Sequence, residues 1–220
     1  MSDVGGDETV LINSIVICDM RKTVTESSPL LPLNSKASGY LQSKLASYYY
    51  GMYQAARGRH VTFVLPAGMY GPSPFVDRAL EPTLFTGTLR MAITGELKRY
   101  AHFPVAWPYV DDVARICLSA LDKGADGIRY LAGGRAEDVC SLAEFCNIGC
   151  EEAGVAHRVE DFDPSEGSDE IGSMKALAET AFATPLLDPT VTTRKLGVEL
   201  TPLQTGIAQT VRWLRDQGRI

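Results

Sequence analysis

The sequence lacks the features that mark several large classes of protein. Its 220 residues are 45% hydrophobic and 22% charged, a composition that excludes a wholly disordered, collagen-like or coiled-coil chain. No stretch reaches the roughly 18 consecutive apolar residues that a membrane span needs. Residues 1–10 contain neither the basic region nor the apolar run of a secretory signal. We therefore expect a cytoplasmic protein with no membrane partner.

Positive charge is also scarce. The 21 basic residues are outnumbered by 27 acidic ones, which gives a net charge of −6, and Lys and Arg form no cluster. Phosphate backbones and anionic membranes attract basic patches, so we expect no nucleic-acid partner. The length suits one good-sized domain or two small ones, which usually have about 50–250 residues each.

Cysteine is sparse and arranged without a metal-binding or redox pattern. The five cysteines are an odd number, contain no CxxC pair and have no histidines at metal-ligand spacing. We expect reduced, mostly buried thiols and no metal site. Cys146 and Cys150 stand four residues apart on a predicted helix, where we expect them to pack in the core. The set comprises Cys18, Cys117, Cys140, Cys146 and Cys150.

The first third of the chain predicts a strand, a helix and a second strand. Residues 9–17 form a nearly unbroken apolar, β-branched run, which is typical of a parallel strand covered on both faces. A polar connection over residues 19–38 precedes a predicted helix over 39–57, which Gly58 ends, and a strand over 60–65, which Pro66 ends. This order is half of a doubly wound α/β layer.

The remainder predicts an α/β pattern with a shaped loop near its beginning. Residues 66–74 are rich in Gly and Pro and follow the second strand, at the sheet edge where open α/β sheets bind ligands. We expect Asp111 or Asp112 to cap a helix that ends near Gly124, and Trp213 to lie on the apolar face of the last helix. The other expected elements are irregular helix over 75–93, an extended piece over 104–110, a strand over 127–132, a helix over 141–153, a strand over 158–162 and a helix over 203–217.

Tyr40 and Lys44 form the pair that carries the most chemistry. They stand four residues apart on the predicted helix, so their side chains project from one face. A lysine ammonium about 4 Å from a phenol stabilises the phenolate by about 4 kcal/mol at an effective dielectric constant of about 20. Tyr40 could then exchange a proton with a substrate oxygen that the Ser14 hydroxyl holds in line. The pair alone carries little weight, because a solvated cross-turn contact has the same spacing.

Five segments in one order resemble the extended short-chain dehydrogenase/reductase family, in its NAD(P)-dependent epimerase, dehydratase and dihydroflavonol-reductase-like group. Ser14 lies at the family's strand-end serine, and Tyr40 to Lys44 (YLQSK) is similar to its YxxxK. The other three segments are LPAGMYGP at 65–72, similar to R-P-x-x-V-Y-G-P, WPYVDDVA at 107–114, similar to W-x-x-V-D-D-V-A, and RKLG at 194–197, similar to R-x-L-G.

The resemblance implies a partial doubly wound, Rossmann-like parallel sheet with a small C-terminal substrate-binding α/β part. Residues 1–8 would be a flexible N-terminus and 9–220 a single incomplete domain, with a catalytic strand-helix-strand over 9–72 and a substrate side over 73–220. The implied activity is an NAD(P)-dependent oxidoreductase or epimerase acting on a small carbonyl or hydroxyl compound, in small-molecule biosynthesis.

The resemblance also implies site residues. The catalytic group is Ser14, Tyr40 and Lys44, and Lys44 also holds the nicotinamide ribose. The cofactor-binding group is Tyr40, Lys44, Pro66, Ala67, Gly68 and Met69, the last four through backbone that faces the nicotinamide.

Several of these residues have structural interpretations that stay open. Residues 66–72 could form merely a turn. Asp111 and Asp112 suit the positive end of a helix dipole, which favours capping over catalysis. Three aromatic residues could line a substrate pocket or pack in the core: Phe75, Trp107 and Tyr109.

The chain departs from the family pattern in three side chains and in one missing motif. Leu65 stands where the family usually has an arginine, and Gly68 stands where it frequently has an asparagine. Ser47 stands near a position where the family commonly has a glutamate. No G-x-x-G-x-x-G segment, which would receive the cofactor pyrophosphate, is present. In the strand order 3-2-1-4-5-6, the strand at residue 9 would be the fifth and would form an open apolar edge.

Three hypotheses follow from the missing motif. The chain is a shortened form of a reductase that binds NAD(P); or it is an isomerase or dehydratase that works without a dinucleotide; or it is a non-catalytic remnant. In the last case a homodimer or a partner chain would cover the open edge.

Overall fold

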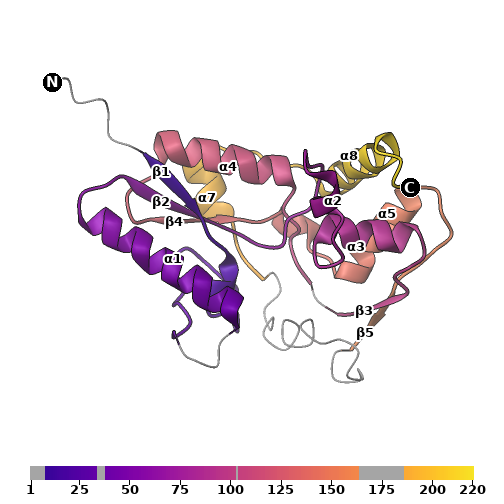
Figure 1. Cartoon of the computed structure of the whole chain (residues 1–220), viewed down its shortest axis with the longest axis horizontal. Coiled ribbons are helices and arrows are strands. Elements are labelled where there is room, and N and C mark those ends of the chain that lie inside the picture. Colours follow the sequence, from indigo (N-terminus) through magenta and orange to yellow (C-terminus); the bar gives the residue numbers. More distant parts are fainter. Residues whose placement is uncertain (1–7, 34–37, 103, 164–185) are drawn as a thin grey trace.

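The computed structural model describes residues 8–33, 38–102, 104–163 and 186–220 (Figure 1). Its larger sheet has three parallel strands in the order β1-β2-β4. In the register, Thr9 is paired with Val61, and Phe63 with Arg129. The strands are β1 (Thr9–Ile12), β2 (Val61–Pro66) and β4 (Arg129–Ala132).

Helices cover both faces of this sheet (Figure 1). On one face the helix α1 (Gly39–Ala56) packs Tyr48 against Phe63 of β2, with ring centroids 4.6 Å apart. On the other face Val64 of β2 packs among residues of α4 (Val110–Lys123) and α7 (Thr190–Leu196). Every residue of β2 is buried. The prediction of a strand covered on both faces was made for residues 9–17, and it is wrong for β1. Thr9 and Ile12 are exposed and the two residues between them are half-buried, because β1 lies at the edge of the sheet within the described residues.

A second group of elements packs beside the sheet. The helices α3, α5 and α8 lie together, next to a small parallel sheet of β3 and β5 (Figure 1). Their apolar residues join the same core as the residues between α1 and the larger sheet. The elements are α2 (Val76–Ala79), α3 (Phe85–Ile93), β3 (Arg99–Ala101), α5 (Leu142–Glu152), β5 (Glu160–Phe162) and α8 (Leu203–Asp216), with short 3-10 helices η1 (Ile15–Ile17) and η2 (Ala136–Asp138).

Local sequence signals set several helix ends. Ser38 caps α1 by accepting a hydrogen bond from the backbone N–H of Leu41 at 3.2 Å. In α5 the side chain of Ser141 accepts from the N–H of Glu144, whose carboxylate in turn accepts from the N–H of Ser141. This reciprocal pair satisfies two backbone donors that a helix start leaves free. The predicted ends of these helices are confirmed to within about two residues.

Two predicted boundaries are wrong, and a third segment is extended as predicted without forming a longer strand. The first strand ends at Ile12 rather than residue 17, because the polar residues Asn13 and Ser14 turn the chain into η1. The helix α4 begins at Val110, so Asp111 and Asp112 lie in its first turn and neither is its N-cap. The extended piece over 104–110 forms only isolated bridges, while the strand β3 lies just before it.

The cysteines are free, and Cys18, Cys146 and Cys150 are buried as predicted. Burial raises the pKa of the half-buried Cys140 to about 12. In the parts of the chain that the structure describes, no three His, Cys, Asp or Glu side chains are grouped as metal ligands would be. No helix in those parts is long and apolar enough to cross a membrane. The predicted flexible N-terminus falls, apart from Glu8, outside the described residues.

Candidate active site

Two segments of the site predicted from the sequence lie at the same edge of the larger sheet. Because β1, β2 and β4 are parallel, the segments that follow them emerge together at their carboxyl ends. Asn13 and Ser14 follow β1, and residues 67–71 follow β2. In open parallel sheets this edge is where ligands bind.

Asn13 connects the end of β1 to the helix that carries Tyr40 and Lys44. Its side-chain oxygen accepts from the N–H of Ser14 at 2.9 Å, and its side-chain nitrogen donates to the carbonyl of Lys44 at 3.0 Å. Asn13 is 3% exposed, so both bonds are shielded from competing water. Sequence reasoning missed Asn13, because the strand was predicted to continue through residue 17.

Tyr40 and Lys44 lie side by side on the first turns of α1. The Lys44 ammonium nitrogen is 5.6 Å from the centroid of the Tyr40 ring. Tyr40 is 56% exposed, and the Ser43 hydroxyl donates to its backbone carbonyl at 2.7 Å. Among the described residues, neither the Tyr40 hydroxyl nor the Lys44 ammonium has a hydrogen-bond partner. Both groups are therefore available to a bound molecule.

Ser14 is nearly buried in the segment that follows β1. It is 8% exposed, and its hydroxyl oxygen accepts from the N–H of Val16 at 3.4 Å. The hydroxyl proton is not committed by that bond, since the oxygen acts there as the acceptor. The structure thus places Ser14, through Asn13, on the same scaffold as Lys44.

The loop after β2 is held by specific contacts. Gly71 has a φ of +136°, its N–H donates to the Thr86 hydroxyl at 3.0 Å, and its carbonyl accepts from that hydroxyl at 3.2 Å. A Cβ atom on Gly68 would lie 2.0 Å from the Phe85 ring. Pro66 and Ala67 are buried, whereas Met69 is 38% exposed. This loop is therefore packed into the fold at both glycines.

Two of the three aromatic residues expected near a substrate lie in the core. Trp107 is 2% exposed, donates from its ring nitrogen to the carbonyl of Cys140 at 3.1 Å, and packs between Phe85 and Phe145. Tyr109 is 3% exposed, and burial raises its pKa to about 12. Phe75 is 75% exposed. The three side chains thus have different surroundings, and their role in a pocket stays a prediction.

Asp112 connects α4 to the segment before α8. Its carboxylate is 1% exposed. It accepts from the backbone N–H of Thr201 at 2.8 Å, from the Thr201 hydroxyl at 2.7 Å and from the Arg115 guanidinium. These contacts give Asp112 a structural function that the sequence reading did not anticipate.

The comparisons with known proteins agree with this architecture. A nucleoside-diphosphate-sugar epimerase from Pseudomonas aeruginosa superimposes with a TM-score of 0.76 over 97% of this chain and 68% of its own, at 20% identity. The UDP-glucuronic acid 4-epimerase from Bacillus cereus, in complex with NAD, gives a TM-score of 0.70 over 96% of this chain and 62% of its own, at 14% identity. The chain has the Rossmann-like fold of the extended short-chain dehydrogenase/reductases.

Sequence comparison finds a distant relative with a different name. Sterol demethylase protein B from Methylococcus capsulatus is 28% identical over 205 residues, which cover 82% of this chain. The aligned region spans 58% of the length of that relative. No protein-family model matches the chain. The Rossmann-like fold is therefore shown by the structural comparisons.

Proposed function

We propose that the chain is the catalytic and substrate-side part of an NAD(P)-dependent oxidoreductase or epimerase that acts on a small carbonyl or hydroxyl compound. One observation carries the proposal. The exposed Tyr40 and the half-buried Lys44 are connected through Asn13 to Ser14, at the carboxyl edge of a parallel sheet. Proton transfer to a substrate oxygen needs a donor, a charge beside it and a group that positions that oxygen.

Each residue of the proposed site has a distinct task. Tyr40 gives a proton to the substrate oxygen, or takes it away in the opposite direction. The Lys44 ammonium stabilises the phenolate that Tyr40 becomes when it has donated. The Ser14 hydroxyl donates to the same substrate oxygen and fixes its direction relative to Tyr40.

The residues present suit the nicotinamide end of a dinucleotide. Lys44 has no hydrogen-bond partner among the described residues, so its ammonium can bind a ribose hydroxyl. The backbone of the loop after β2, from Pro66 to Met69, would lie against the nicotinamide. NAD(P), when bound, supplies the acceptor or donor of a hydride. Together these residues hold the substrate and the nicotinamide end.

The names of the similar proteins limit how narrowly the substrate class can be proposed. They refer to nucleoside-diphosphate sugars in the structural comparisons and to a sterol in the sequence comparison. We therefore keep the proposal at a small molecule with a hydroxyl or carbonyl group. We also propose the division into a catalytic part over 9–72 and a substrate side over 73–220, because α3, α5 and α8 pack beside the sheet.

Cofactor binding is the first test. NADH and NADPH are titrated into the chain while tryptophan fluorescence is followed, and saturable binding in the micromolar range is expected. If neither binds while turnover still depends on Tyr40, an isomerase or dehydratase without a dinucleotide replaces the proposal.

Proton transfer is the second test. A panel of nucleoside-diphosphate sugars and hydroxysterols is assayed by NAD(P)H absorbance with Tyr40→Phe, and Tyr50→Phe is the matched control because Tyr50 is 61% exposed on the same helix. Tyr40→Phe is expected to lower kcat by about 10²-fold or more, and Tyr50→Phe to leave it unchanged. Equal activity of the two variants removes Tyr40 from the mechanism.

The edge of β1 favours a second candidate function, the binding of a further strand. Within the described residues β1 pairs only with β2, and Ile12 at its end is 52% exposed. An open apolar strand edge is a template for pairing with another chain. Light scattering of the purified chain tests this: a dimer or larger species supports pairing between copies, and a monodisperse monomer contradicts it.

A further inference from the structure

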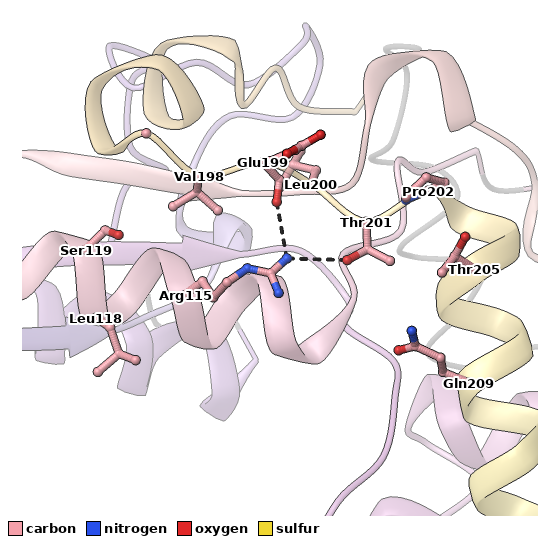
Figure 2. A pocket seen from close by; sticks show the side chains of 11 residues that line it. Arg115, Leu118, Ser119, Val198, Glu199, Leu200, Thr201, Pro202, Thr205 and Gln209 are labelled. Atoms are coloured by element: carbon pink, nitrogen blue, oxygen red, sulfur yellow. Dashed lines mark hydrogen bonds between the residues drawn. The ribbon is translucent and has the colours of Figure 1, made fainter.

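A cavity of about 650 Å³, lined by both polar and apolar side chains, lies between α4, α8 and the segment that joins α7 to α8 (Figure 2). It is remote from the Tyr40–Lys44 pair, because α1 and α4 cover opposite faces of the larger sheet (Figure 1). From α4 come Arg115, Leu118 and Ser119, and from α8 come Thr205 and Gln209. A cavity of this size can hold a small organic molecule.

The guanidinium of Arg115 is only partly used by the protein. All three of its recorded hydrogen bonds come from one nitrogen, Nη2, which donates to Asp112, to the Glu199 carbonyl at 3.2 Å and to the Thr201 hydroxyl at 3.4 Å. Among the described residues, Nη1 and Nε have no partner. The side chain is 49% exposed, so these donors are open to a ligand while Nη2 holds the group in place.

Three further side chains around the cavity can donate hydrogen bonds, whereas the carboxylate of Glu199 can only accept them. The Gln209 side-chain oxygen accepts from the Tyr109 hydroxyl at 2.7 Å, which leaves its amide NH₂ to donate. The hydroxyls of Ser119 and Thr205 have no partner among the described residues and can donate too. The Glu199 carboxylate points away from Arg115 (Figure 2). A ligand that presents several acceptor oxygens fits this set.

We propose that this cavity binds an oxyanion, either a phosphoryl or a carboxylate group, carried on a small apolar body. Arg115 Nη1 and Nε, the Gln209 amide and the Ser119 and Thr205 hydroxyls would donate to the oxygens. The apolar body would cover Leu118, which is 66% exposed. The inference is independent of the proposed catalytic site, since it uses none of its residues.

The test follows the Nε–H signal of Arg115 and the backbone amide of Ser119 by NMR, with phenyl phosphate and benzoate as probes. Saturable shifts with a Kd of about 1 mM are expected for at least one probe. Tighter binding of phenyl phosphate assigns a phosphoryl ligand, and tighter binding of benzoate a carboxylate. No saturable shift with either probe overturns the proposal.

Substitution of Ser119 provides the matched comparison. Ser119→Glu places a carboxylate four residues after Arg115, where it competes for the free guanidinium nitrogens. Ser119→Glu is expected to raise the Kd of the more tightly bound probe by about tenfold or more, which corresponds to about 1.4 kcal/mol. Ser119→Gln has a similar size to Ser119→Glu without the charge, and its amide can donate in place of the lost hydroxyl. It is expected to weaken binding less than Ser119→Glu does. Equal affinities of the two variants overturn the proposal.

Discussion

Replacement of Asp112 by alanine tests the structural junction between α4 and the segment before α8. The carboxylate is 1% exposed and accepts from Thr201 twice and from Arg115. Its loss leaves the Thr201 N–H and hydroxyl without their acceptor and releases Arg115 from its ion pair. Hydrogen bonds to charged groups contribute about 1.5–3 kcal/mol each, and breaking a buried ion pair costs about 3–5 kcal/mol.

We expect Asp112→Ala to lower the free energy of unfolding by about 3 kcal/mol. The value lies at the low end of that range because Arg115 is half exposed and regains water when the carboxylate is removed. For a chain of this length the melting temperature should fall by about 6–12 °C. Asp112→Asn keeps one acceptor oxygen and should cost less. Thr201→Val removes a single hydrogen bond to this carboxylate and should cost about 1.5 kcal/mol.

Urea unfolding followed by the fluorescence of the buried Trp107 measures all three variants. The order of destabilisation should be Asp112→Ala, then Asp112→Asn, then Thr201→Val. A structural role also requires that activity per folded molecule survive Asp112→Asn. The reasoning is refuted if Asp112→Ala stays within about 1 kcal/mol of the parent chain, or if Thr201→Val costs more than Asp112→Ala.

Three further predictions concern local features. Gly68→Ala should destabilise the fold by about 1–3 kcal/mol in thermal unfolding, because its Cβ would lie 2.0 Å from a packed phenyl ring; Gly39→Ala, with nothing within 4 Å, should cost nothing. Ser141→Ala should cost about 1 kcal/mol, since α5 loses its capping pair, and a cost below about 0.3 kcal/mol would contradict this. Hydrogen bonds from Arg21 lower the pKa of Asp19 from 3.8 to about 2, so the stability that this pair adds should be present above pH 4 and lost towards pH 2; an NMR titration midpoint near 4 would disprove it.

The helices and the buried strand were predictable because their signals are local. The helix α1 has a serine cap at one end and a glycine with φ of +82° just beyond the other. The strand β2 is an apolar run that ends at Pro66, as expected for a strand buried on both faces. In each case the residues that decide the structure lie within the element or directly beside it.

The first strand shows why apolar runs alone mislead. Residues 9–17 are apolar except near Asn13 and Ser14, and those two residues end the strand. Ile15 and Ile17 still enter the core, but from a 3-10 turn. The family resemblance implied that Ser14 lies at the end of this strand. The bond from Asn13 to the Lys44 carbonyl, 31 residues away, had no local signal that fixes it.

Asp112 illustrates a long-range contact for which a signal did exist. Its partner Thr201 is 89 residues away, so the two acids at the start of α4 suggested only a favourable interaction with the helix dipole. Helical spacing, however, places Asp112 on the same face as Ile116 and Ala120, both of which are buried. Asp111, one position earlier, is exposed. An acidic residue within the apolar stripe of a predicted helix therefore indicates a buried donor on another element, because its charge is not tolerated there without one.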